Sequence, residues 1–469
     1  MRAMSIALVW FRRDLRVHDN RALVAALNDG HVPIPVYVHA PAEEAPWVPG
    51  GASRWWLHHS LAALDAALRD RGSRLVLADG PSAGALGDLV RRTGAAAVYW
   101  ERLYEPHLAR RDRGVARALE QAGVAARVLP GGLLVEPEAV ATRSGTPFRV
   151  FGAYWRAWRR TVDGSGGPQP APAHLPAPRR WPRGHAPNAL GVLPEHPWTG
   201  KLARTWTPGE AAGLQRLADF VDVALEGYAG SRDLPGEDGV SRLSPRLHFG
   251  EISARQVWRA VINAPGGAGV EAYLRQLAWR DFAYHLLHHF PDMAERSLDR
   301  RFDAFPWRRR YGTLLRRWQQ GRTGYPMVDA GMRELWHTGW MHNRARMLAA
   351  SLLVKNCRIP WQEGARWFWD TLVDADLANN TLGWQWTAGT GPDAAPYFRI
   401  FNPTRQGQRF DAGGEYTCRW VPELAGLSAA QLHQPHGRAA GDYPPPMVDF
   451  ADSRREALAG YQRVRSRRR

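Results

Sequence analysis

The chain has 469 residues, of which 45% are hydrophobic, and it carries only two cysteines, Cys357 and Cys418. This length predicts roughly two to four domains with sizeable cores. No apolar run approaches the ~18 residues of a membrane span, and two cysteines exclude a disulfide framework and a cysteine-based metal site. We therefore expect a protein of a reducing cytoplasm without a resident metal ion.

The net charge of +17 and the sequence pI of about 10.6 indicate a polyanionic partner. Only two of the 62 basic residues are lysines, Lys201 and Lys355. Arginine presents a planar fork that suits phosphate and stacks on nucleobases. A GC-rich genome explains the scarcity of lysine equally well, but the net charge still favours a nucleic-acid partner.

The first ~135 residues alternate short apolar runs with helical patterns. Continuous apolar strands separated by helices favour a parallel, doubly wound α/β sheet, here of five strands. The first strand lacks a following GxGxxG, and the chain has no GxxxxGK[ST], which disfavours a dinucleotide or nucleoside-triphosphate cradle. The expected strands are Ile6–Trp10, Pro33–Val38, Arg74–Ala78, Ala96–Trp100 and Ala126–Pro130.

Residues 136–215 are predicted to be an interdomain linker, because proline and glycine are concentrated there, above all between Thr161 and Pro208. From residue 216 to 469 helical patterns dominate, and strand-like runs are scarce. The sequence thus predicts an α/β domain over residues 1–135 and a helical domain over residues 216–469.

The segment SRLSP, residues 241–245, predicts a phosphate site at a helix start. Ser244 suits the N-cap, Pro245 suits the first helical position, and free backbone amides there can bind phosphate together with Arg242. An ordinary capped helix without a ligand is the alternative.

Two helical segments carry side chains suited to DNA. Gln276, Trp279 and Arg280 share one helical face, as do Asn343 and Met347, and each set combines side chains that can read, stack on or hold a nucleotide. Amphipathic helices with half-buried tryptophans explain the same pattern.

The stretch from Asp374 to Pro403 combines two carboxylates, two neighbouring asparagines and two tryptophans, followed by the aromatic and basic run YFRIF. A packing core does not require so many polar groups beside indole rings, whereas a site for a large, polar, electron-accepting ring does. A helix end that is merely aromatic remains the alternative.

Several long blocks of the chain resemble the photolyase/cryptochrome family, and in particular its bacterial class I cyclobutane pyrimidine dimer photolyases. They are LVWFRRDLRVHDNRAL, SRLSP, TGYPMVDAGMRELWHTGWMHNR, DADLANN, GWQW and DAAPYFRIFNP, in this order. The resemblance implies an α/β antenna domain followed by an all-α domain that binds FAD. It also implies a carbon–carbon lyase in which an electron passes from photoexcited, reduced FAD to a flipped-out dimer, the ring opens and the electron returns.

The resemblance assigns roles to residues of this chain. Those expected around FAD are Tyr228, Val240, Ser241, Arg242, Leu243, Ser244, Tyr273, Gln276, Arg280, Asn343, Arg346, Asp374, Asp376 and Asn380. Among them, Arg346 is expected to pair with Asp374 near the flavin, and Asn380 is expected to face the flavin N5. Those expected to bind DNA are Arg232, Gln276, Trp279, Arg280, Asn343, Arg344, Met347, Trp386, Arg399 and Gln406. The electron-transfer triad is expected at Trp384, Trp361 and Trp307.

Two of these positions, Gln276 and Val240, depart from the pattern of the family. Gln276 replaces the glutamate that is usual in cyclobutane-type enzymes and loses its charge. Gln at this position is frequent in (6-4) photolyases, but Asn343 and Met347 stand where that subtype has its paired histidines, so cyclobutane repair is favoured. Val240 replaces a hydroxyl residue and removes one phosphate contact.

The second chromophore is left open by the sequence. Glu105 matches a folate-contacting glutamate, but Ala294 and Glu295 occupy the positions of the Cys–Lys pair of folate-binding relatives. A deazaflavin (8-hydroxy-5-deazaflavin), a folate (methenyltetrahydrofolate) and an empty pocket are all compatible with these residues.

The expected partner is UV-damaged DNA, single- or double-stranded, and the expected state is a monomer in the bacterial cytoplasm, associated with the nucleoid through DNA. One alternative is a cryptochrome-type blue-light photoreceptor without repair activity. Another, from a different class, is a non-enzymatic DNA-binding protein whose aromatic residues only stack on bases.

Overall fold

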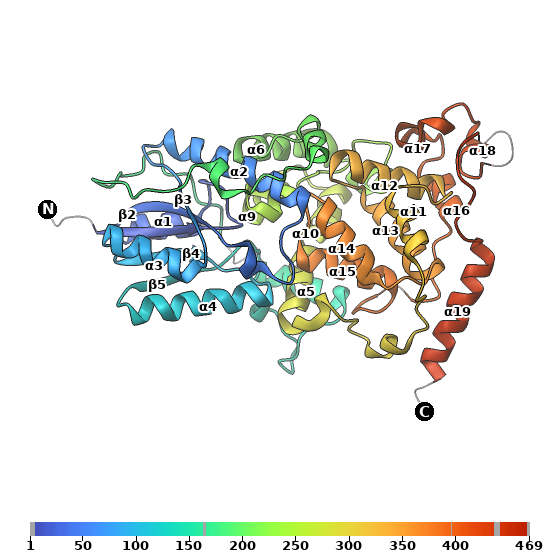
Figure 1. Cartoon of the computed structure of the whole chain (residues 1–469), viewed down its shortest axis with the longest axis horizontal. Helices are drawn as coiled ribbons and strands as arrows, with labels where there is room; N and C mark the ends of the chain where they lie inside the picture. Colours follow the sequence, from blue (N-terminus) through green and yellow to red (C-terminus); the bar gives the residue numbers. More distant parts are fainter. Residues whose placement is uncertain (1–4, 163–165, 395, 436–440, 467–469) are drawn as a thin grey trace. The chain divides into compact units, whose positions relative to one another are not determined.

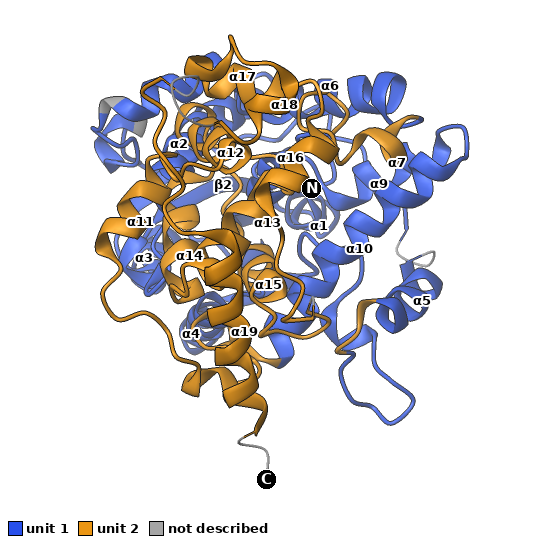
Figure 2. Ribbon diagram, turned by 90° about the vertical axis from the view of Figure 1, so that its right-hand side faces the viewer, with its two compact units in different colours: residues 1–148, 152–226, 241–289 blue, residues 149–151, 227–240, 290–469 orange. Residues whose placement is uncertain are grey.

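The computed structural model describes residues 5–162, 166–394, 396–435 and 441–466 (Figure 1). Contacts divide the chain into two compact units, drawn in different colours in Figure 2. Unit 1 comprises residues 1–148, 152–226 and 241–289, and unit 2 comprises residues 149–151, 227–240 and 290–469. These units are defined by contacts between residues, whereas the predicted domains were defined by sequence composition. The predicted domain boundaries at residues 135 and 215 therefore stay a prediction.

Unit 1 contains the predicted sheet, which has five parallel strands in the order β3-β2-β1-β4-β5. Its centre is apolar on both faces, and Leu8, Ile34 and Val98 are fully buried. Right-handed crossovers place α1 on one face and α3 and α4 on the other. The elements are β1 (Ile6–Phe11), α1 (Arg21–Asn28), β2 (Val32–His39), α2 (Gly51–Arg69), β3 (Val76–Asp79), α3 (Ser82–Thr93), β4 (Ala97–Glu101), α4 (Pro106–Gln121) and β5 (Ala125–Leu129).

The proline-rich segment after the sheet packs into unit 1 more closely than a linker would. Leu175 and Leu202 are fully buried, and Trp198 and Trp206, which lie on either side of Leu202 in the sequence, are buried as well. The helices that follow the sheet in this unit are α5 (Phe151–Val162), which begins at the edge of unit 2, and α6 (Glu210–Asp219), α8 (Ser244–Phe249), α9 (Ala254–Asn263) and α10 (Ala268–His289).

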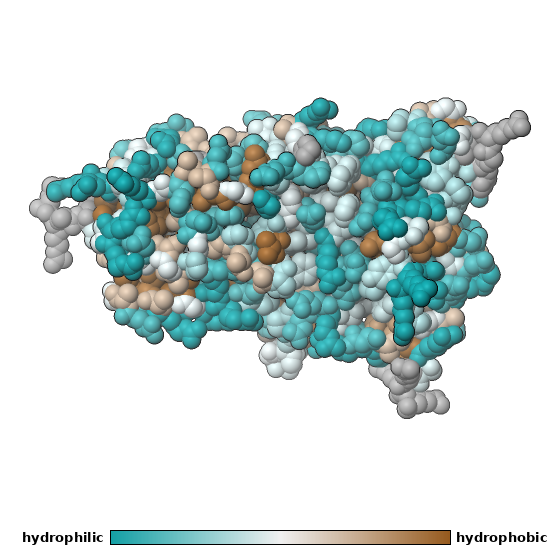
Figure 3. Space-filling view, in the orientation of Figure 1, coloured by the Kyte–Doolittle hydropathy of each residue, from teal (hydrophilic) through white to brown (hydrophobic). Residues whose placement is uncertain are grey.

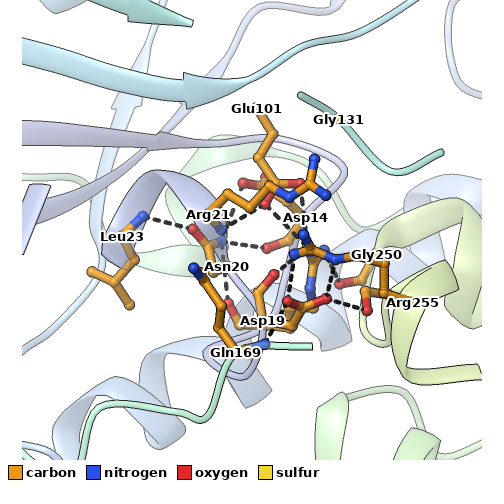
Figure 4. A network of polar contacts seen from close by, with 12 residues as sticks. Asp14, Asp19, Asn20, Arg21, Leu23, Glu101, Gly131, Gln169, Gly250 and Arg255 are labelled. Atoms are coloured by element: carbon orange, nitrogen blue, oxygen red, sulfur yellow. Dashed lines mark hydrogen bonds and ion pairs between the residues drawn. The ribbon is translucent and has the colours of Figure 1, made fainter. Parts of the chain in front are cut away.

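A network of buried charges joins the exit of β1 to the connection between α8 and α9 (Figure 4). Arg16 contacts Glu101 at 3.1 Å and donates to the Gly250 carbonyl at 3.2 Å. Arg255 donates to Asp19 at 3.0 Å, and Asp19 is a non-glycine residue in the left-handed region, with φ 55°. Guanidinium groups meet the carboxylates of Glu101 and Asp19, so these ion pairs help to hold α8 at a fixed place on the sheet.

Unit 2 is helical, and no strand occurs among its described residues. Two buried carboxylates of α12 fix neighbouring segments: Asp329 accepts from the Tyr443 hydroxyl at 2.5 Å, and Glu334 accepts from the Tyr416 hydroxyl at 2.6 Å. The helices are α7 (Tyr228–Ser231), α11 (Gly312–Gln319), α12 (Pro326–Thr338), α13 (Asn343–Ser351), the π-helical η8 (Leu352–Asn356), α14 (Trp361–Thr371), α15 (Leu377–Ala388), α16 (Pro403–Phe410), α17 (Glu415–Trp420), α18 (Ala429–Leu432) and α19 (Phe450–Ser466). The predicted fold class, a parallel α/β domain plus a helical domain, is confirmed.

The face drawn in Figure 3 is mostly hydrophilic, with apolar residues in separate small patches. Large apolar side chains that are exposed include Val223 at 83% and Phe398 at 63%. None of the helices in the described ranges has the length and apolar character needed to cross a bilayer.

Candidate functional site

The SRLSP segment of unit 1 adopts a strained turn before α8. Arg242 has φ 52°, a left-handed conformation that costs an arginine roughly 1–3 kcal/mol and is found mostly at functional sites. The Ser241 hydroxyl accepts from the Tyr273 hydroxyl at 3.0 Å and from the Leu243 amide at 3.4 Å. The prediction that Ser244 is the N-cap is wrong, because Leu243 takes that position and Ser244 begins the helix without a side-chain cap.

Helix α10 carries the predicted substrate-facing residues of unit 1. Gln276, Trp279 and Arg280 are all half-buried on this helix. The Gln276 amide donates to the Ala272 carbonyl one turn back at 3.0 Å, which holds the side chain along the helix. Arg280 donates to the Gly132 carbonyl at 2.7 Å, which fixes its guanidinium.

Asp281, which the sequence did not single out, holds the segment that supplies that carbonyl. It is buried, and it accepts from the amides of Leu134 at 3.1 Å and Val135 at 3.0 Å and from the Trp158 indole at 2.9 Å. Burial raises the pKa of Asp281 to about 6, although Arg280 opposes this shift. The sequence feature that could have identified Asp281 is the position of an acidic residue among the apolar residues of this helix.

In unit 2, the predicted pair of Arg346 and Asp374 is present. Arg346 Nη2 lies 2.8 Å and 3.1 Å from the two Asp374 oxygens, and its Nε donates to the Met341 carbonyl at 2.7 Å. Asp376 is the N-cap of α15 and accepts from the Asn379 amide at 2.9 Å. The carboxylate of this ion pair thus lies two residues before the N-cap of the helix that carries Asn380 and Trp384.

Asn380 and Trp384 lie on α15, next to α14. The Asn380 amide donates to the Ala365 carbonyl of α14 at 3.1 Å. Trp384 is 2% exposed, and a Cβ at Gly364 would lie 2.0 Å from its ring, so only glycine fits beneath the indole. Its Nε1 is buried and finds no hydrogen-bond partner in the described part of the chain.

The other two predicted triad residues are positioned by hydrogen bonds. The Trp361 indole, 1% exposed at the start of α14, donates to the Ser297 hydroxyl at 3.1 Å. Trp307 is half-buried and donates to the Phe302 carbonyl at 3.1 Å. Trp384 and Trp361 therefore lie on two packed helices, while Trp307 reaches solvent.

The predicted pairing of Asn343 and Met347 on α13 is present, since the Asn343 amide lies 3.7 Å from the Met347 sulfur. Arg344, predicted to hold DNA, pairs with Asp233 at 2.8 Å and lies over the Phe410 ring at 4.1 Å. Met347 and Trp386 are half-buried, and Asn343 is exposed.

The remaining predicted residues of unit 2 differ in exposure. Arg232 lies over the ring of buried Tyr228, 5.5 Å from its centroid. Arg399 is exposed, whereas Gln406 has a buried side-chain oxygen without a hydrogen-bond partner among the described atoms, and Val240 is half-buried.

Glu105, the candidate antenna residue, is 1% exposed and pairs with Arg13, which also lies 3.6 Å from Glu44. It caps α4 beyond the end of β4, where the strand order reverses from β1 to β4. This edge is where ligands of parallel sheets bind. Ala294 and Glu295 lie in and next to a short 3-10 helix of unit 2.

The expected ligands of FAD divide between the units. Unit 1 holds Ser241 to Ser244, Tyr273, Gln276 and Arg280, and unit 2 holds the others. Hydroxyls, a guanidinium and a strained backbone turn fit a diphosphate, and the Arg346–Asp374 pair fits a polar ring, so the residues present suit the cofactor. In the described ranges no group of His, Cys, Asp and Glu could hold a metal ion.

Comparisons with known proteins agree along the chain. Residues 7–178 match the model of a family described as DNA photolyase, and residues 273–463 match the FAD binding domain of DNA photolyase. A deoxyribodipyrimidine photo-lyase of Agrobacterium fabrum is 44% identical over 98% of each chain. The chain belongs to the photolyase/cryptochrome family.

The relatives of this chain include both photolyases and cryptochromes. Cryptochrome-2 of Arabidopsis thaliana is 38% identical over 96% of this chain and 78% of its own length. The crystal structure of a bacterial class III photolyase from Agrobacterium tumefaciens is similar with a TM-score of 0.94 and 43% identity, over 99% of each chain. The predicted class I assignment therefore has no support. The prediction of FAD is supported by the matched domain.

Proposed function

We propose that this protein repairs UV-damaged DNA by splitting cyclobutane pyrimidine dimers in light, with FAD as its cofactor. The observation that carries the choice of lesion is the contact between the Asn343 amide and the Met347 sulfur on one face of α13. An amide beside a thioether offers hydrogen bonds and a soft apolar surface to a pyrimidine pair, and neither group can deliver a proton as a histidine would.

The cofactor would be held by the residues that the family resemblance places around FAD. Ser241, Arg242 and Ser244 would bind its diphosphate, and the Arg346–Asp374 pair and Asn380 would face its ring system. When bound, FAD supplies the electron that the lesion takes up after absorption of light. The buried, close-packed indole of Trp384 would exclude water and provide an oxidisable side chain next to the ring.

The substrate side would combine stacking with phosphate contacts. Trp279 and Trp386 would clamp the extruded dimer, which costs less to unstack than normal bases because it already pairs badly. The exposed Arg399, together with Arg232, would bind phosphates without reading sequence, which makes affinity dependent on salt. Arg344 is paired with Asp233, so its contribution would be to hold the segment that carries Arg232.

We further propose the class III subtype, which rests on the similarity to the crystal structure of the class III photolyase from Agrobacterium tumefaciens, with a TM-score of 0.94. The second candidate function is a blue-light photoreceptor. It is favoured by the cryptochromes among the relatives at 38% identity and by Gln276, which lacks the charge of the usual glutamate.

Chromatography of reaction products after illumination distinguishes these functions. The FAD-containing protein should convert oligonucleotides with a cyclobutane dimer to intact pyrimidines in light and leave (6-4) photoproducts unchanged. A dark sample serves as control, and equal loss of dimers in the dark would contradict the mechanism. FAD-loaded protein that photoreduces but repairs neither lesion would instead support the photoreceptor.

A further inference from the structure

Lys355 is a fully buried lysine, one of only two lysines in the chain. It lies in the π-helical turn η8, a distortion found mainly at functional sites. Its Nζ donates to the main-chain carbonyl of Arg399 at 2.8 Å and lies 5.3 Å from the centroid of the Tyr397 ring. A buried cation thus anchors the backbone of a residue whose own side chain is exposed.

The loop of residues 396–401 is built around this anchor. Tyr397 is 2% exposed, whereas Phe398 is 63% exposed and Arg399 is also exposed. The Arg399 amide donates back to the Pro396 carbonyl at 2.8 Å, so the chain turns tightly between its buried and its exposed residues. The ring of Tyr397 packs against Phe302, Phe305 and Tyr461, at centroid distances of 5.5, 5.5 and 4.6 Å.

A purely structural anchor would not need a charge. Burial and, to a smaller extent, the nearby positive charge of Arg399 lower the pKa of Lys355 to about 7. A neutral donor such as an amide would bind the same carbonyl without these costs. In its protonated form the lysine adds a positive charge beside Arg399, which raises the positive potential of the exposed loop.

We propose that Lys355 is a positioning residue for DNA binding, which holds the Arg399 carbonyl so that the Arg399 guanidinium is presented to the DNA phosphates. The proposal rests on the proposed function, since it takes DNA as the ligand of Arg399. Lys355 acts through the loop backbone and does not itself touch DNA.

A double-mutant cycle in the full-length, FAD-loaded protein tests this role. The variants are K355M, R399A and the double variant, and methionine is chosen because its flexible chain fills the space of a buried lysine. Binding of an oligonucleotide with a cyclobutane dimer is measured over a series of salt concentrations. K355M should weaken binding about three- to tenfold and reduce the salt slope by about one, as R399A does, because one phosphate contact is lost.

The cycle separates positioning from general damage. If Lys355 acts through Arg399, K355M should have no further effect on DNA affinity in the R399A background. Additive losses, or K355M binding as tightly as wild type, would overturn the proposal. Y397F is the matched control, because the Tyr397 hydroxyl is buried without a partner among the described atoms, and its removal should leave affinity unchanged.

Two further outcomes keep the inference distinct from the proposed function. If R399A binds DNA as tightly as wild type, Arg399 makes no DNA contact that matters, and the proposed role of Lys355 is overturned. Light-driven repair by the wild type would still support the proposed function as a photolyase. If K355M does not fold, K355Q replaces it. Glutamine retains a donor but no charge, and its affinity should lie between those of wild type and R399A, so an affinity equal to that of wild type would overturn the proposal.

Discussion

Buried cations have different partners in the two units. In unit 1, Arg255 lies against the Asp19 carboxylate, and Arg16 lies against Glu101. In unit 2, Lys355 is met by a neutral carbonyl and an aromatic ring. Burial alone would lower the pKa of Arg16, but the carboxylates of Glu101, Asp19 and Asp14 raise it above its ordinary value, whereas burial lowers the pKa of Lys355 to about 7.

The two arrangements differ in their effect on stability. The ion pairs of unit 1 stabilise the fold, whereas the buried charge of Lys355 destabilises it. A guanidinium with a carboxylate partner is compensated, and removing one partner exposes the full desolvation cost of the other. A lysine facing a carbonyl is compensated only in part, so the folded protein favours its neutral form. An ion pair is expected where a charge serves only to stabilise the fold. A buried lysine without a carboxylate partner requires a different explanation, and we propose that it positions the Arg399 loop.

The largest effect should come from breaking a compensated pair. Asp19→Asn removes the charge but keeps the shape, and asparagine tolerates the left-handed backbone at φ 55°. Because Arg255 would remain buried without a counter-charge, the free energy of unfolding should fall by about 3–5 kcal/mol. Urea denaturation followed by circular dichroism measures this change.

Ser253→Ala is the matched control for that variant. The Ser253 hydroxyl donates to the same Asp19 carboxylate, but its removal leaves the ion pair intact. Because this hydroxyl also caps α9 by accepting from the Gln256 amide, we expect a loss of about 2 kcal/mol. If Asp19→Asn costs no more than Ser253→Ala, the buried charges of unit 1 are not compensated in the way proposed.

An intermediate effect should appear in the pH dependence of Lys355. Its ordinary pKa is 10.5 and its pKa in the folded protein is about 7, so between these values the unfolded chain binds a proton that the folded chain does not. Stability must therefore rise with pH across this window, and the cost of the buried charge is fully present below pH 7. The stability of wild type relative to K355M should grow by roughly 1–3 kcal/mol from pH 6.5 to 9.5.

Urea midpoints of both proteins at several pH values measure this difference. Groups common to the two proteins cancel, because only Lys355 differs between them. A constant difference across the window would mean that Lys355 titrates as it does in water, and the contrast with Arg16 would be lost.

The same contrast shows what the sequence could predict. The five strands were predicted to within two residues at most ends, because runs of buried apolar residues are a local signal. The Arg346–Asp374 pair and the Asn343–Met347 contact were also predicted, the first from family motifs and the second from helical spacing as well.

Roles that depend on distant partners were not predicted from the sequence. Lys355 was noted only for its rarity, since nothing near it in the chain indicates the Arg399 carbonyl 44 residues away. Gly364 was missed because its need for space arises from the Trp384 ring on another helix. The predicted N-cap at Ser244 failed by one position, because the left-handed Arg242 shifts the turn before α8.

The smallest effect should come from an exposed pair in unit 1. Arg69 and Asp65 form an i,i+4 contact at 2.7 Å on α2, where the arginine side chain is 60% exposed. Arg69→Met keeps a good helix former and removes only a solvent-screened charge, so the free energy of unfolding should change by less than about 0.5 kcal/mol. Urea denaturation in low and high salt measures it, with Asp65→Asn for comparison.

Asp65 also accepts from the Leu75 amide at 2.8 Å, where the chain approaches β3. Its replacement should therefore cost more than that of Arg69, and the excess should persist in high salt because that hydrogen bond does not depend on the arginine. A loss above 1 kcal/mol for Arg69→Met would show that pairing matters for arginines of this unit even at the surface. The ion pair of the buried Arg255 would then no longer differ from those of exposed arginines in how much it contributes to the free energy of unfolding.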